Sequence, residues 1–126
     1  ETLRAAKQAW QDRLIVVFQP HRFSRTQALL PEFIQAFGDA DDLILADIYP
    51  AGEDPIEGVS SLALRDSLAE GGQRNVIYIP AFDDIVDHLL SVARPTDVVV
   101  TLGAGNVWKI GEALAVRLKD TIREGR

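Results

Sequence analysis

Four short apolar runs, separated by stretches of helical periodicity, constrain the fold of this chain more than any other feature. The runs span Leu14–Phe18, Leu43–Ile48, Val76–Ile79 and Val98–Leu102. Each run is continuous rather than alternating and rich in β-branched residues, which is typical of strands covered on both faces of a parallel sheet. Parallel strands need crossover connections of a dozen or more residues, and the intervening segments are long enough to supply them.

Apolar residues recur at helical spacing between and after these runs. The stripes comprise Leu30, Phe33, Ile34 and Phe37 before Gly38; Leu62, Leu64 and Leu68 before Gly71–Gly72; Phe82, Ile85, Val86, Leu89 and Leu90; and Val107, Ile110, Leu114, Leu118 and Ile122. A further helix is predicted over residues 1–11, with Leu3, Ala6 and Trp10 on one side. The sequence therefore predicts a Rossmann-like three-layer α/β domain, with a mostly parallel sheet of about four strands flanked by helices.

The size and composition of the chain fit a single soluble domain. It has 126 residues, a formal net charge of -6 and no cysteine. A nucleic-acid surface would normally require a basic patch, and no apolar run approaches the roughly 18 residues of a membrane-spanning helix. We expect a cytoplasmic protein with no nucleic-acid partner and no membrane segment. With two histidines and no cysteine, we also expect no metal site.

A cationic segment, Gln19–Thr26, follows the first apolar run directly. Ligands of open α/β sheets bind outside the carboxyl ends of the strands, and arginine is unfavourable at the positive end of a helix unless an anion is present. His21, Arg22 and Arg25 are therefore candidates for an anion clamp. The alternative is that both arginines are solvated and His21 caps a turn.

The same segment carries two signals for its helix. Ser24 followed by Gln27 fits a capping box, which predicts a helix beginning at Arg25. Pro31 then falls inside the helical pattern, so we expect a kink or a restart there.

Two further loops are predicted at the same edge of the sheet. The first, Asp47–Pro55, contains the acids Asp47, Glu53 and Asp54, which could orient an amine or hold a metal through water. The alternative is that they are ordinary solvated acids. In Thr101–Asn106, glycines would let backbone amides approach a ligand, or they only form a tight turn. Trp108 replaces the third glycine of a dinucleotide fingerprint, and no ATP phosphate loop is present in the sequence.

Taken together, three segments resemble ordered signatures of the UDP-N-acetylmuramate–L-alanine ligases within the Mur ligase family. They are Phe18–Thr26, Asp47–Ile56 and Gly103–Asn106. The resemblance implies that residues 1–126 are the C-terminal, amino-acid-binding domain of a larger three-domain enzyme, with the first strand of the domain missing. It also implies that His21, Arg22 and Arg25 hold the carboxylate of L-alanine. A substrate or closure role is implied for a second set of residues: Tyr49, Glu53, Gly103, Gly105 and Asn106.

The resemblance further implies the chemistry of the whole enzyme. That enzyme would use ATP and Mg²⁺ to join L-alanine to UDP-N-acetylmuramate in peptidoglycan biosynthesis, with the catalytic residues in a central ATPase domain. We therefore expect no catalytic residue within this chain, and no cofactor bound to it in isolation. Trp108, where the family often has glycine, and Pro31 depart from the pattern. Two alternatives remain: the related ligase that recycles murein peptides, and a non-catalytic Rossmann-like module that binds a nucleotide or metabolite.

Overall fold

The computed structural model describes residues 13–103 and 105–123, in which strands and helices alternate. The strands are β1 (Leu14–Phe18), β2 (Asp42–Leu45), β3 (Val76–Tyr78) and β4 (Val98–Leu102). The helices are α2 (Phe23–Ala28), α3 (Leu30–Ala36), α4 (Ser61–Glu70), α5 (Phe82–Val92) and α6 (Trp108–Arg123). The helix predicted over residues 1–11 lies outside the described residues.

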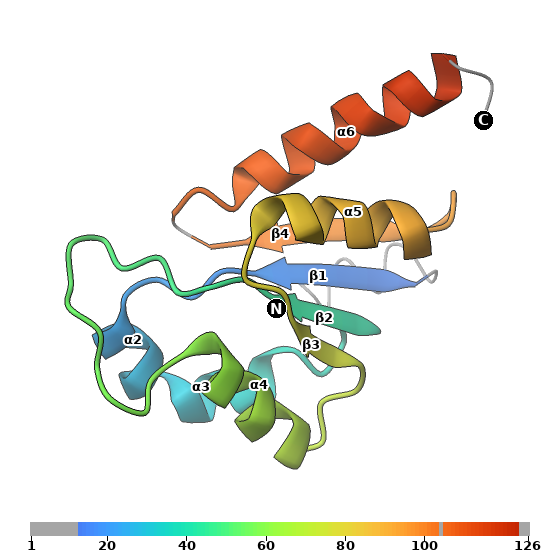
Figure 1. Cartoon of the computed structure of the whole chain (residues 1–126). Helices are drawn as coiled ribbons and strands as arrows, with labels where there is room; N and C mark the ends of the chain where they lie inside the picture. Colours follow the sequence, from blue (N-terminus) through green and yellow to red (C-terminus); the bar gives the residue numbers. More distant parts are fainter. Residues whose placement is uncertain (1–12, 104, 124–126) are drawn as a thin grey trace.

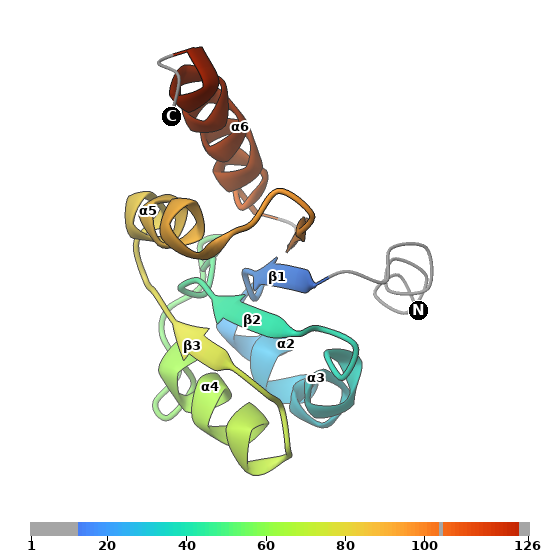
Figure 2. The same ribbon diagram turned by 90° about the vertical axis from the view of Figure 1, so that its right-hand side faces the viewer.

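The four strands form one parallel sheet in the order β3-β2-β1-β4. In register, Val16 pairs with Leu43 of β2 on one side and with Val100 of β4 on the other. Helices α2, α3 and α4 lie on one side of the sheet, whereas α5 and α6 lie on the other (Figures 1 and 2). The predicted three-layer, Rossmann-like architecture is confirmed.

Alternation along the central strand divides the core into two halves. Leu14 and Val16 pack with Leu64 and Leu68 of α4 on one face. Ile15 and Val17 face the opposite side, toward a cluster completed by residues of α5 and α6 that include Ile85, Leu89, Ile110 and Leu114. Because both faces of β1 are buried, every residue from Leu14 to Val17 is apolar.

The predicted strand boundaries were too generous at two places. β2 ends at Leu45 rather than at residue 48: the Ala46 N–H makes a last bond to the Phe18 carbonyl, and the Ala46 carbonyl accepts from the Ser61 hydroxyl. β3 ends at Tyr78, because Ile79 makes one last bond to the Leu45 carbonyl and Pro80 has no N–H.

The expectation of full burial was also wrong for parts of the outer elements. All five residues of β4 are only half-buried, because in the described sheet β4 lies at an edge. Leu62 and Leu118, placed on buried stripes by their spacing, are 47% and 44% exposed. A helix presents a full stripe to the core only where a sheet or another helix lies beneath it.

Among the described residues, no helix is both long and apolar enough to cross a membrane.

The restart predicted at Pro31 is confirmed. Helix α2 ends at Ala28, Leu29 lies between the two helices, and α3 carries the proline in its first turn. Proline is tolerated there because the first N–H groups of a helix have no partner within it.

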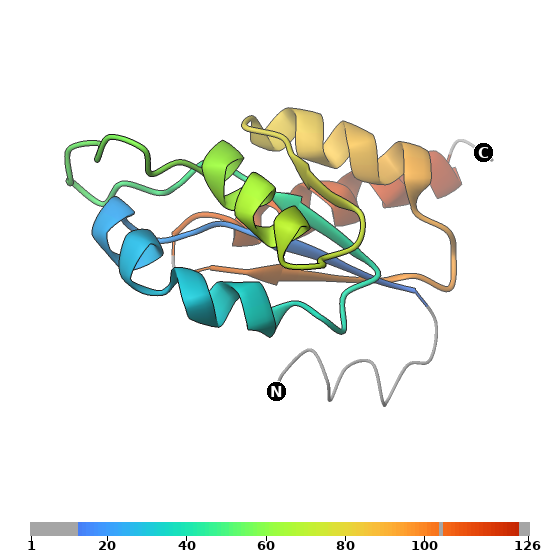
Figure 3. The ribbon, with the colours of Figure 1, turned by 90° about the horizontal axis from the view of Figure 1, so that it is seen from below.

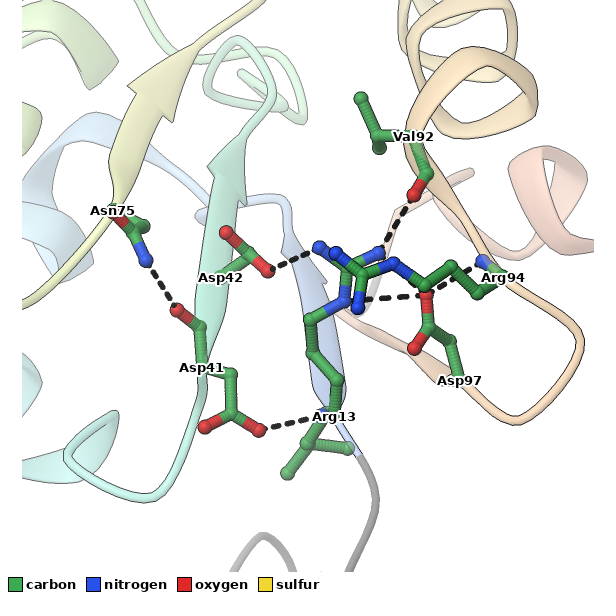
Figure 4. Close-up of polar contacts among 8 residues, drawn as sticks. Arg13, Asp41, Asp42, Asn75, Val92, Arg94 and Asp97 are labelled. Atoms are coloured by element: carbon green, nitrogen blue, oxygen red, sulfur yellow. Dashed lines mark hydrogen bonds and ion pairs between the residues drawn. The ribbon is translucent and has the colours of Figure 1, made fainter.

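A network of ion pairs and hydrogen bonds, drawn in Figure 4, joins the amino ends of the strands. These ends lie opposite the carboxyl ends that carry the predicted loops. The Arg13 guanidinium donates to the Asp97 carboxylate at 2.6 Å and pairs with Asp42 at 3.4 Å. Asp97 also accepts from the Arg94 N–H, and the backbone of Leu14 donates to Asp41. The network therefore links β1, β2 and the turn before β4.

Candidate anion-binding site

The loops that follow β1, β2 and β4 gather at one end of the molecule, the left end in Figures 1 and 3. This end holds the carboxyl ends of the parallel strands. The connection after β1 runs to one face of the sheet and the connection after β4 to the other, so the strand order reverses between these two neighbours. Such a switch point is where open α/β sheets bind ligands.

The first two loops remain paired beyond the end of their strands. The Arg22 N–H donates to the Tyr49 carbonyl at 2.8 Å, and the Tyr49 N–H donates to the Pro20 carbonyl at 2.9 Å. The His21 and Tyr49 rings stack, with centroids 5.7 Å apart and planes 11° from parallel. Tyr49 therefore packs against the cationic segment.

Arg22 has a backbone conformation that non-glycine residues rarely adopt. Its φ is 66° and its ψ is 147°, at the residue before the first turn of α2. Conformations of this kind cost about 1–3 kcal/mol and persist only where the surroundings enforce them. Here the Arg22 N–H is held by Tyr49, and its carbonyl accepts from the N–H and the hydroxyl of Thr26 at 3.1 and 2.7 Å.

Glu53 caps helix α2 from the neighbouring loop. Its carboxylate accepts hydrogen bonds from the N–H groups of Phe23 and Ser24, at 2.8 and 3.1 Å, and from the Ser24 hydroxyl. The Ser24 hydroxyl and N–H hold the pKa of Glu53 below its usual range, and the Arg22 charge contributes to the same shift. The predicted capping box between Ser24 and Gln27 is therefore wrong: α2 begins at Phe23, and Ser24 donates to Glu53 instead of capping.

This cap also changes the electrostatic argument for a ligand. The anion expected at the positive end of α2 is supplied by Glu53 of the chain itself. A ligand is not needed to neutralise that helix end, so the case for a clamp rests on the arginine side chains.

Those side chains line an open pocket. His21, Arg22, Ser24, Arg25 and Ala28 surround a volume of 420 Å³. Both arginines are exposed, and neither guanidinium forms a hydrogen bond or ion pair with any residue in the described part of the chain. Two unpaired guanidiniums beside an imidazole form a site suited to a carboxylate or phosphate.

The loop after β4 is fastened to the same end by Gln19. Gln19 is buried, donates from its amide to the Asn106 side chain at 3.0 Å, and accepts from the Asn106 N–H at 3.1 Å. A Cβ on Gly105 would lie 2.7 Å from the Tyr49 ring and 2.8 Å from the Gln19 amide oxygen. A Cβ on Gly103, whose φ is 151°, would lie 2.8 Å from the Gln19 carbonyl.

The structure therefore brings the predicted site residues together in two groups. His21, Arg22 and Arg25 share the pocket, whereas Gly103, Gly105 and Asn106 pack on Gln19 and do not line it. Gln19 was not identified as a site residue from the sequence. The sequence offered one signal for Gln19, namely an amide side chain directly after a buried strand. In the structure this residue lies where β1 runs beside β4.

The remaining acids of the second loop act separately. The Tyr78 hydroxyl donates to Asp47, and this bond, with burial, raises the pKa of Tyr78 to about 12. Asp54 is exposed. Within residues 13–103 and 105–123, no three His, Cys, Asp or Glu side chains are grouped so that they could hold a metal ion.

The fold and these loops define a Rossmann-like α/β domain with a cationic pocket at its switch point. Comparison with known proteins gives the family. Residues 1–105 match the model of the Mur ligase, glutamate ligase domain. The chain belongs to the Mur ligase family.

Individual relatives agree with this membership. A UDP-N-acetylmuramate–L-alanine ligase of Geotalea uraniireducens is 54% identical over 94% of this chain, and one of Syntrophus aciditrophicus is 56% identical over 94%. The chain spans about a quarter of the length of these relatives, 26% and 25% respectively. In fold, it is similar to a murein peptide ligase of Psychrobacter arcticus, with a TM-score of 0.65 at 18% identity, covering 91% of this chain and 24% of the other.

Proposed function

We propose that this chain is the amino-acid-binding domain of a ligase that joins L-alanine to UDP-N-acetylmuramate. The observation that carries the proposal is the identity of 54% and 56% to two such ligases over nearly the whole chain. In the whole enzyme, a separate ATPase domain would bind ATP and Mg²⁺ and transfer the terminal phosphoryl group to the muramate carboxylate, releasing ADP. The amine of L-alanine would then attack the acyl carbon and lose a proton as phosphate leaves.

In this proposal the pocket binds the carboxylate of the incoming amino acid. Arg22 and Arg25 supply unpaired guanidiniums, and His21 supplies a third donor when protonated. Binding the carboxylate leaves the amine free to point away from the pocket. The turn at Gly103–Asn106 and the loop carrying Tyr49 border this end of the sheet and would face the ATPase domain when the enzyme closes.

The murein-peptide ligase is the second candidate, and it has weaker support. Its structural similarity is at 18% identity, which supports a shared fold and not a shared substrate. The other alternative was a non-catalytic Rossmann-like module. Its dinucleotide-binding form is disfavoured because Trp108 occupies the position of the third glycine in the dinucleotide-binding fingerprint.

The Arg25→Ala change in the whole ligase tests the pocket. Arg25 lies within α2, where alanine preserves the helix, so the change removes the guanidinium alone. Loss of one charge-assisted bond costs about 1.5–3 kcal/mol, and we expect KM for L-alanine to rise roughly ten- to a hundred-fold. Steady-state kinetics with L-alanine varied would measure it.

Arg74→Ala is the matched control. Arg74 is also exposed, but it lies just before β3, at the amino ends of the strands and therefore at the end of the sheet opposite the pocket. Its removal should leave KM for L-alanine unchanged. An Arg25→Ala enzyme with an unaltered KM would contradict the assignment of the pocket.

A further inference from the structure

We propose that Glu53 is a positioning residue for this pocket, holding Arg22 in its strained conformation and leaving the guanidiniums of Arg22 and Arg25 unpaired. The inference rests on the proposed function of the pocket. It assigns Glu53 an internal partner, the first turn of α2, instead of the substrate.

The Glu53 carboxylate is occupied by the first turn of α2. A carboxylate offers about four lone-pair sites, and three donors from Phe23 and Ser24 occupy Glu53. A free carboxylate at this place would pair with a nearby arginine. Because Glu53 is held by the helix, it contributes negative charge near Arg22 without forming an ion pair with it.

The backbone is held on either side of Arg22. The Arg22 N–H is fixed by Tyr49, and the next N–H, that of Phe23, is fixed by Glu53. Tyr49 and Glu53 belong to the same loop, which is closed by a bond from the Glu53 N–H to the Pro50 carbonyl at 3.0 Å. One loop therefore holds the Arg22 residue on both sides, against a φ of 66° that it would otherwise leave.

The direct test is Glu53→Gln in the whole ligase. Glutamine keeps one acceptor oxygen for the N–H groups of Phe23 and Ser24, but it loses the negative charge and the oxygen that accepts from the Ser24 hydroxyl, so the first turn of α2 beside Arg22 is held less firmly. We expect KM for L-alanine to rise roughly five- to thirty-fold, the range expected for a lost helix cap, with kcat and KM for ATP unchanged. A merely destabilised enzyme would lose kcat in proportion to its folded fraction and keep its KM.

Glu57→Gln is the matched control. Glu57 is an exposed glutamate of the same connection between β2 and α4, and Glu57→Gln makes the same change in charge. KM for L-alanine should not change in this variant. Ser24→Ala removes one of the three bonds and gives a second test if Glu53→Gln folds poorly; its KM should rise in the same direction by a smaller factor.

Combining Glu53→Gln with Arg22→Ala separates positioning from an independent contact. If Glu53 acts by positioning Arg22, the double variant should raise KM by less than the product of the two single effects. Multiplying effects, or an unchanged KM in Glu53→Gln while Arg25→Ala raises it, would overturn the positioning role and leave the proposed function standing. An unchanged KM in Arg25→Ala would instead overturn the proposed function.

Discussion

At the scale of single residues, two glycines show why this site is built as it is. Gly105 lies where a Cβ would overlap the Tyr49 ring, and Gly103 combines a φ of 151° with a close approach to Gln19. Close contact between the loop after β4 and the loop after β1 thus requires the absence of side chains. The glycines serve packing between loops, whichever ligand the neighbouring pocket binds.

We predict that Gly105→Ala destabilises the 126-residue chain by about 1–3 kcal/mol, because the added methyl must displace Tyr49 or Gln19. Gly111→Ala is the control with the opposite sign. Gly111 lies within α6 with nothing within 4 Å of its built Cβ, and alanine there should stabilise by about 0.5–1 kcal/mol. Urea denaturation would measure both, and equal free energies of unfolding for the two variants would contradict this reading.

At the scale of elements, opposite ends of the sheet have different roles. The carboxyl ends of β1, β2 and β4 carry the three loops that meet beside the pocket, whereas the amino ends are joined by Arg13. The side chain of Asp97 is only 3% exposed, and its contact with Arg13 spans 84 positions of sequence. A charge that is nearly buried must be paired, so this contact fixes the turn before β4 against β1.

We predict that this network makes the stability of the chain depend on pH. Hydrogen bonding to Arg13 is the largest cause that holds the pKa of Asp97 below its usual range. The unfolded chain therefore binds this proton more readily, so the contribution is complete above the ordinary carboxyl pKa and is lost as pH falls through the lowered value.

Asp97→Asn isolates that contribution. It should lower the free energy of unfolding at neutral pH by about 1.5–3 kcal/mol and flatten the loss of stability in acid. The control is Asp66→Asn, because Asp66 is exposed and pairs with Arg65 at the surface, where such pairs contribute little. Denaturation midpoints over an acid series measure the effect, and parallel curves for the natural chain and Asp97→Asn would contradict it.

At the scale of the whole molecule, the three loops form one continuous surface. Gln19 joins the first loop to the third, and Tyr49 and Glu53 join the second to the first. The pocket is open, and the arginines that line it are exposed. In the proposed function, this open surface would meet the ATPase domain of the whole ligase.

We predict that the 126-residue chain alone releases no phosphate from ATP when supplied with UDP-N-acetylmuramate and L-alanine. Its sequence contains no phosphate-binding loop, and its described residues include no metal-binding cluster. A phosphate-release assay would measure this, with the whole ligase as the positive control. Turnover by the isolated chain would contradict the division of labour between the domains.

The sequence by itself determined the architecture, because burial on both faces of a sheet leaves a readable signal. The continuous run Leu14–Phe18 and the helical stripe at Ile85 and Leu89 report which faces are covered. Pro31 likewise predicted that one helix ends and another begins beside it, since the effect of proline is local. The three loop motifs could be predicted to lie together because parallel strands bring their carboxyl ends to one end of the sheet.

Tertiary structure alone decided how those loops meet. The cap on α2 comes from Glu53, 30 positions from Phe23, and a pattern of neighbouring residues pointed instead to Ser24 and Gln27. The bond between Gln19 and Asn106 spans 87 positions. Local periodicity carries no information about such pairs, because they depend on the order of the strands and on where each loop leaves the sheet.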